Sequence, residues 1–187
     1  MSHAIYIRIN SRQFKKTEIE SSINNLVHDL QWIDDHNLKA DLDDFERVQL
    51  KLMFASFQHD LGITLSGVLG FDEDGIMGEF MDFACENRLG KLTGSAELLL
   101  LEKSTGRKEL MLRLDHLFES IGRDEMETAR MYLETGRNVN ASAQHLYLHR
   151  NTFRYRLNKF IAQTGLDIRE IDQGRLMDMW FQLHDID

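Results

Sequence analysis

Residues 138–157 read NVNASAQHLYLHRNTFRYRL, and this stretch decides the fold of the C-terminal part of the chain. Asn140 suits the N-cap of a short helix, because an Asn side chain accepts a hydrogen bond from a free backbone N–H at a helix start. Ala143 and Leu146 face inward from that helix. His149 opens a longer helix after a tight turn. Its apolar face consists of Phe153, Leu157, Phe160 and Ile161.

The segment before this stretch predicts another helix. Ala129, Tyr132 and Leu133 share one helical face. Gly136 suits the left-handed residue that follows a helix end, and Gly165 suits the same position after the longer helix. The order of helix, short helix, turn and longer helix is that of a helix-turn-helix domain. In such domains the second helix of the pair enters the major groove of DNA.

Charge is distributed unevenly along the chain. The 187 residues include 22 Lys/Arg and 31 Asp/Glu, which gives a net charge of −9. Residues 1–122 hold 13 cations and 21 acids, a net −8, and residues 123–187 hold 9 and 10, a net −1. Residues 137–169 hold six cations and one acid, Asp167, a net +5. The overall charge argues against a generally basic nucleic-acid coat, whereas the local charge favours one DNA-binding surface.

The composition change marks Gly122 as the expected domain boundary. We expect residues 1–122 to form an acidic, mostly helical domain that dimerises or senses a signal. Residues 123–187 are expected to form the helix-turn-helix DNA-binding domain.

The pattern of apolar residues in 1–122 predicts several helices and one short β element. The apolar positions from Thr17 to Ile33 are spaced by three and four residues, which predicts one helix. Further helices are expected near residues 43–61, 76–84, 94–104 and 110–121. Ile5, Ile7 and Ile9 alternate with polar positions, and residues 62–71 show a similar pattern. We expect these two segments to be short strands paired with each other, in a mostly α fold.

The longer basic helix supplies the expected contacts with DNA bases. Arg150 suits a bidentate contact with guanine and Asn151 one with adenine. Arg154 lies one turn after Arg150, and Tyr155 beside it can stack or donate its hydroxyl. Phosphates position a protein without reading sequence, and the side chains better placed for them are Thr152, Arg156, Lys159 and Arg137. The complete set of expected DNA-binding residues is Arg137, Ser142, His149, Arg150, Asn151, Thr152, Arg154, Tyr155, Arg156 and Lys159.

Three segments of the chain, 138–143, 148–157 and 164–167, resemble the C-terminal helix-turn-helix of PucR/CdaR-type transcriptional regulators. The string His-Arg-Asn-Thr-x-x-Tyr-Arg-Leu at 149–157 is the most specific part, and the resemblance extends over about residues 124–183. It implies that the helix from His149 binds double-stranded DNA and that the protein is a homodimer. An N-terminal sensory region is common in that family, which leaves a small-molecule effector open.

Other functional classes lack support in the sequence. The N-terminus has no secretory signal and no segment approaches the roughly 18 apolar residues of a membrane span, so we expect a cytoplasmic protein. We find no Gly-rich phosphate loop, nucleophile elbow or metalloprotease helix, and we expect neither an enzyme nor a cofactor. His145 and His149 are four residues apart but flank the turn, so we expect no metal site.

One alternative to DNA binding stays open. Some helix-turn-helix domains mediate assembly with a partner regulator, and the acidic remainder of the chain is compatible with such a protein-interaction module.

Overall fold

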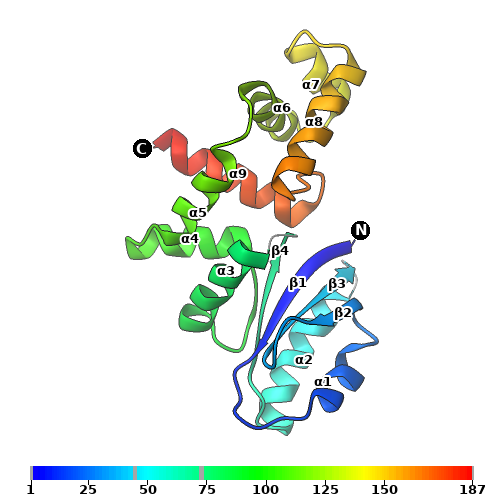
Figure 1. Cartoon of the computed structure of the whole chain (residues 1–187), viewed down its shortest axis with the longest axis vertical. Helices are drawn as coiled ribbons and strands as arrows, with labels where there is room; N and C mark the ends of the chain where they lie inside the picture. The colour runs from blue at the N-terminus through cyan, green and yellow to red at the C-terminus, as the bar shows by residue number, and fades with distance from the viewer. Residues whose placement is uncertain (1, 44–45, 72–73, 187) are drawn as a thin grey trace. The chain divides into compact units, whose positions relative to one another are not determined.

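The structure, a computed structural model, describes residues 2–43, 46–71 and 74–186. Its contacts divide the chain into two compact units, Met1–Leu98 and Leu99–Asp187. The described part contains nine helices and five strands (Figure 1). None of its helices is long and apolar enough to cross a lipid bilayer. The DNA-binding domain predicted at residues 123–187 lies within the second unit, which begins upstream of it.

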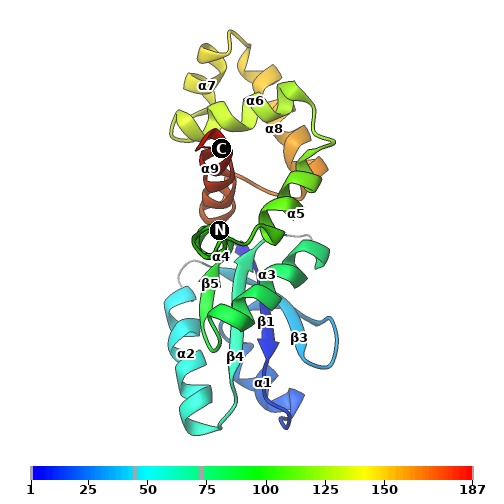
Figure 2. The same ribbon diagram turned by 90° about the vertical axis from the view of Figure 1, so that its left-hand side faces the viewer.

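The first unit is built on a five-stranded sheet with the order β2-β3-β1-β4-β5 (Figures 1 and 2). The strands are β1 (Ser2–Ile9), β2 (His28–Trp32), β3 (Asn37–Asp43), β4 (Leu65–Gly70) and β5 (Leu92–Gly94). β4 and β5 are parallel, and the other neighbours are antiparallel. The predicted pairing is confirmed, because β1 pairs with β4 with Ile7 opposite Gly67. The prediction of only two strands is wrong.

Helices cover both faces of this sheet. They are α1 (Lys16–Ile23), α2 (Arg47–Asp60) and α3 (Asp74–Asn87). Ile19 of α1 and Phe54 of α2 join the core with Ile5 and Ile7 of β1. α3 packs against β1 and β4 from the other side. β4 is therefore buried along its whole length, which explains why it contains only apolar or small residues.

The prediction of one helix from Thr17 to Ile33 is wrong. α1 ends at Ile23, and residues 28–32 form β2, which pairs with β3. Ile19 and Ile23 are the buried residues of α1, whereas Leu30 and Trp32 alternate with exposed residues along β2. The local pattern could not reveal this change, because the partner strand β3 lies later in the chain.

The second unit is helical. It holds the end of α4 (Ser95–Thr105), followed by α5 (Glu109–Phe118), α6 (Arg123–Glu134), α7 (Val139–His145), α8 (Arg150–Thr164) and α9 (Ile171–Ile186). Phe118 packs between Phe160 and Trp180, with ring centroids at 6.2 and 4.8 Å. Phe153 is fully buried and lies 6.3 Å from the Tyr132 ring. These aromatic contacts join α5, α6, α8 and α9 into one core.

A substitution at Gly67 tests how closely α2 packs on the sheet. A Cβ at this position would lie 2.9 Å from Leu92 Cδ1 and 3.0 Å from the ring of Phe54, which is buried. We expect Gly67→Ala to lower the free energy of unfolding by about 1–3 kcal/mol, because overpacking forces the ring to shift. Urea unfolding followed by circular dichroism measures this change.

Gly78→Ala is the matched control for Gly67→Ala. A Cβ at Gly78, inside α3, meets no atom within 4 Å. This substitution should raise the free energy of unfolding by about 0.5–1 kcal/mol, because Ala loses less backbone entropy in a helix. The described packing would be contradicted if both alanine variants stabilised the protein equally.

Candidate nucleic-acid interface

The start of α7 is fixed by Asn138 and not by Asn140. The Asn138 side chain accepts hydrogen bonds from the backbone N–H groups of Asn140 at 3.0 Å and Ala141 at 3.1 Å. Asn138 has extended backbone angles, whereas Asn140 already lies inside the helix. The predicted N-cap is therefore two residues too late, since both residues have the right chemistry and only the backbone distinguishes them.

Ser142 has a structural position inside the domain. Its side chain is fully buried, and its hydroxyl donates to the Asn138 carbonyl at 2.6 Å. The same oxygen lies 2.6 Å from the Thr135 hydroxyl at the end of α6. Burial leaves Ser142 no surface for DNA, so its predicted DNA contact is corrected to a link between α6 and α7.

The turn after α7 is tight and directs the chain into α8. Leu148 N–H donates to the Ala143 carbonyl at 2.8 Å, and Tyr147 has the left-handed φ of 54°. The His149 ring then caps α8 by accepting the N–H of Asn151 at 3.3 Å. Helix ends at both predicted glycines are confirmed, since Gly136 has φ 67° and Gly165 has φ 68°.

α8 has one buried face and one exposed face. The buried residues are Phe153, Leu157, Phe160 and Thr164. The exposed side chains include Arg150, Asn151, Thr152, Arg154, Tyr155, Asn158 and Lys159. No acidic residue occurs between Arg150 and Thr164. The exposed face therefore offers hydrogen-bond donors and positive charge without local neutralisation from its own helix.

Two of the predicted phosphate contacts are ion-paired with α6. Arg156 lies 2.6 Å from Asp124, and Lys159 lies 2.5 Å from Glu125. The hydrogen bond from Lys159 lowers the pKa of Glu125, which is buried, and raises the pKa of Lys159. These ion pairs connect one flank of α8 to the first turn of α6, so their cations are not freely available to DNA.

Two further cations of the basic segment are also engaged. Arg137 donates from its guanidinium to the Ile171 carbonyl at 3.3 Å and lies over Gly174 at the start of α9. Arg169 pairs with Asp167 at 2.6 Å. The predicted phosphate contact of Arg137 therefore competes with a contact that orders α9.

Arg150 and Arg154 are the remaining cations of this segment. Both are exposed, and within the described ranges neither forms a hydrogen bond or an ion pair. Tyr155, beside Arg154, is 68% exposed. The structure thus brings the expected base-contacting residues together on one surface of α8. The acids that pair with its flank were missed, because nothing in the sequence links Glu125 to a lysine 34 residues later.

The described side chains give no support to a metal site. Among them, no group of three or more His, Cys, Asp or Glu residues is placed to hold a metal ion. His149 caps α8 with one ring nitrogen, which accounts for its position at the turn.

Comparison with known proteins confirms the resemblance seen in the sequence. Residues 126–183 match the family model of the PucR C-terminal helix-turn-helix domain. This range contains α7, α8 and most of α6 and α9. The C-terminal part of the chain is therefore a PucR-type helix-turn-helix domain.

Two curated relatives match part of the chain. The uncharacterized protein YxkF of Bacillus subtilis (strain 168) is 38% identical over 73 residues, which cover 38% of this chain and 24% of that protein. A leucine-rich protein of Streptococcus dysgalactiae subsp. equisimilis is 31% identical over 84 residues, which cover 44% of this chain and 30% of that protein. The chain thus spans less than a third of either relative.

One solved structure aligns with nearly the whole chain. It is a regulator of polyketide synthase expression from Bifidobacterium adolescentis, with a TM-score of 0.49 and 15% identity. The alignment covers 99% of this chain and 80% of that one. A TM-score of this size does not establish a common fold.

The Glu125–Lys159 pair predicts a pH-dependent stability. The folded pKa of Glu125 is below its unfolded value, so its contribution is present above about pH 4.3 and is lost as pH falls through the folded pKa. We expect Glu125→Gln to lower the free energy of unfolding by about 1 kcal/mol at pH 7 and by less below about pH 4. Urea unfolding at a series of pH values measures this change.

Glu127→Gln is the matched control, because Glu127 is an exposed residue of the same helix. It should change the free energy of unfolding little at any pH. Equal effects of the two substitutions would show that the Glu125–Lys159 pair does not stabilise the fold.

The left-handed backbone of Tyr147 predicts that its substitution by glycine stabilises the protein. Its side chain is 97% exposed and its φ is 54°, so Tyr147→Gly removes left-handed strain without removing packing. We expect the free energy of unfolding to rise by up to about 1 kcal/mol. Tyr147→Ala keeps a Cβ and should give no comparable gain in the same denaturation experiment. If the glycine variant were no more stable than the alanine variant, the backbone at Tyr147 would not be strained.

Proposed function

We propose that this protein is a DNA-binding transcriptional regulator that inserts α8 into the major groove of double-stranded DNA. The observation that carries the proposal is the match of residues 126–183 to the PucR C-terminal helix-turn-helix domain, together with the surface of α8. That surface is free of acids and presents the two unpaired arginines of the basic segment. A helix-turn-helix reads DNA with the corresponding helix.

The proposed base contacts follow from the positions of the side chains around α8. Asn151 and Tyr155 are four residues apart and lie opposite the buried face that contains Phe153. Asn151 suits an adenine edge, and Tyr155 adds stacking or a hydroxyl contact. Arg150 and Arg154 lie beside them, one turn apart, where each guanidinium can bind guanine or a phosphate.

The remaining candidates have supporting roles. Thr152 is exposed next to the base-contacting residues and suits a phosphate. His149 lies at the start of α8, where its ring orders the first turn. Arg156 and Lys159 hold α8 against α6 and thereby fix the direction in which Arg150 and Arg154 point. Their proposed contribution to DNA binding is indirect.

The proposal extends to the whole protein as follows. Residues 123–187 bind DNA, and residues 1–122 dimerise or sense a signal. A homodimer places two α8 helices about 34 Å apart on a palindromic site. The protein acts in the cytoplasm and without catalysis.

Charge reversal on α8 tests DNA binding directly. Duplexes are first selected from a random pool with the 187-residue chain, and affinities are then measured by fluorescence anisotropy. We expect Arg150→Glu combined with Arg154→Glu to weaken binding by about 100-fold or more, because each good arginine contact is worth about 1–3 kcal/mol. Circular dichroism checks that the variant stays folded.

Arg12→Glu combined with Lys51→Glu is the matched control. Both residues are exposed in the first unit, and the change in net charge is the same. Neither residue belongs to the proposed DNA-contacting surface of α8, so this control should bind nearly as well as the wild type. Equal losses in both double variants would assign the effect to net charge alone, and unchanged binding of the α8 variant would contradict its role.

The salt dependence separates DNA binding from the alternative of protein assembly. Each phosphate contact adds about 0.9 to the steepness with which log affinity falls against log salt, whereas an apolar protein interface is much less sensitive. A steep fall that becomes shallower in the α8 variant supports the proposal. The alternative of a protein-interaction module would be favoured if the chain bound no selected duplex at low salt and its helix-turn-helix instead mediated association with other protein chains.

A further inference from the structure

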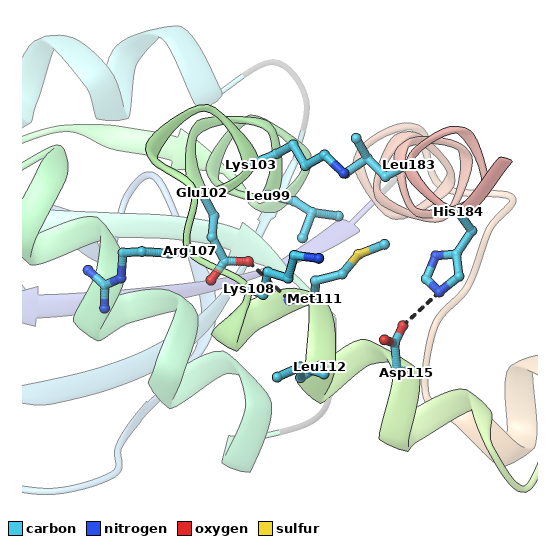
Figure 3. Close-up of a pocket in the computed structure, with 10 residues that line it drawn as sticks. All are labelled: Leu99, Glu102, Lys103, Arg107, Lys108, Met111, Leu112, Asp115, Leu183 and His184. Carbon is cyan, nitrogen blue, oxygen red and sulfur yellow. Dashed lines mark hydrogen bonds and ion pairs between the residues drawn. The ribbon is translucent and has the colours of Figure 1, made fainter. Parts of the chain in front are cut away.

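The second unit contains a small cavity among α4, α5 and α9 (Figure 3). Its volume is about 130 Å³. It is lined by apolar side chains of all three helices and by cations near the start of α5. None of its residues belongs to α8, so the cavity is separate from the DNA-contacting residues proposed above.

The apolar part of the cavity comes from Leu99, Met111, Leu112 and Leu183. Leu99 and Leu183 are buried, whereas Met111 is partly exposed. An apolar cavity of about 150 Å³ holds a benzene molecule. The size of this cavity therefore sets the apolar body of an occupant at about one six-carbon ring or a short alkyl chain.

The acids that line the cavity already have partners in the protein. The Glu102 carboxylate accepts the N–H groups of Leu110 at 2.7 Å and Met111 at 3.1 Å, which fixes the first turn of α5. Asp115 accepts from Trp180 Nε1 at 2.8 Å and lies 3.1 Å from His184 Nε2, the contact drawn in Figure 3. Burial also raises the pKa of Glu102. These hydrogen bonds give both acids a role in the fold.

Three cations lie along the cavity, namely Lys103, Arg107 and Lys108. Arg107 pairs with Glu109 at 3.2 Å. Lys108 is exposed, and within the described ranges it forms no hydrogen bond or ion pair through its side chain. The positive side of the cavity thus contains one ammonium group that the protein itself leaves without a counter-charge.

Lys108 stands at the start of α5, where the Glu102 carboxylate already accepts two backbone N–H groups. Lys108 is the N-cap residue of α5, and its side chain makes no capping hydrogen bond. The N-terminus of a helix carries a partial positive charge, which disfavours a cation and favours an anion. An anionic group beside Lys108 would interact favourably with its ammonium group.

We infer that this cavity binds a small organic anion, with one acidic group at Lys108 and an apolar body of about six carbons against Leu99, Met111 and Leu183. The positive charge of Lys108 favours a ligand with an acidic group, and the volume of the cavity limits the size of the ligand's apolar part. Because α5 and α9 both contribute to the cavity, the ligand joins the helix that precedes the DNA-binding domain to the last helix of that domain. The inference does not depend on DNA binding.

Benzoate is a suitable probe, because its ring matches the cavity and its carboxylate matches Lys108. The 187-residue chain is labelled with ¹³C at its methionine methyl groups, and the Met111 signal is assigned with Met111→Leu. We expect benzoate to shift the Met111 signal saturably in the millimolar range or below. Benzyl alcohol, with the same ring and no charge, should bind about tenfold more weakly, since one charged contact is lost.

Lys108→Gln tests the proposed charge contact. It should weaken benzoate about tenfold and leave benzyl alcohol unchanged. Lys91→Gln, an exposed lysine of the first unit, is the matched control and should leave both unchanged. The inference is overturned if Met111 does not respond to benzoate, if benzyl alcohol binds as tightly, or if both lysine variants behave alike. Any of these outcomes leaves the DNA-binding proposal untouched, because the titration contains no DNA.

Discussion

The burial of one face of α8 is the constraint on which the candidate interface depends. Phe153 is fully buried against Tyr132 of α6, and Phe160 is fully buried against Phe118, which also contacts Trp180. With 3.6 residues per turn, fixing this face in the core forces Asn151 and Tyr155 into water on the opposite side. The same aromatic packing that stabilises the unit therefore selects the side chains that are offered to a partner.

Ion pairing then divides the cations of the basic segment into two kinds. Arg156 and Lys159 pair with acids of α6 and fix the orientation of α8, whereas Arg150 and Arg154 keep their charge exposed. The net +5 of residues 137–169 therefore overstates the charge available to DNA. A buried carboxylate such as Glu125 needs its partner, which makes Lys159 a component of the fold more than of the interface.

The helix-turn-helix could be predicted because its signals are local. The glycines at helix ends, the apolar face of α8 and the family-like string all lie within about 30 residues of one another, and the structure and the family match confirm them. The N-cap of α7 was misplaced because Asn138 and Asn140 have the same chemistry. The five-stranded sheet was missed because a strand such as β2 is stabilised only by pairing with β3. The burial of Ser142 and the partners of Arg156 and Lys159 are tertiary contacts that a single sequence does not show.

The most direct measurement is an NMR titration of the arginine Nε–H signals in the 187-residue chain with a selected DNA duplex. The account predicts that the signals of Arg150 and Arg154 shift, because these guanidinium groups are free to bind bases or phosphates. The signal of Arg156 should stay nearly unchanged, because its partner Asp124 lies 2.6 Å away. The account would be contradicted if the Arg156 signal shifted and the signals of Arg150 and Arg154 did not. Arg156 would then contact DNA, and the two exposed arginines would not.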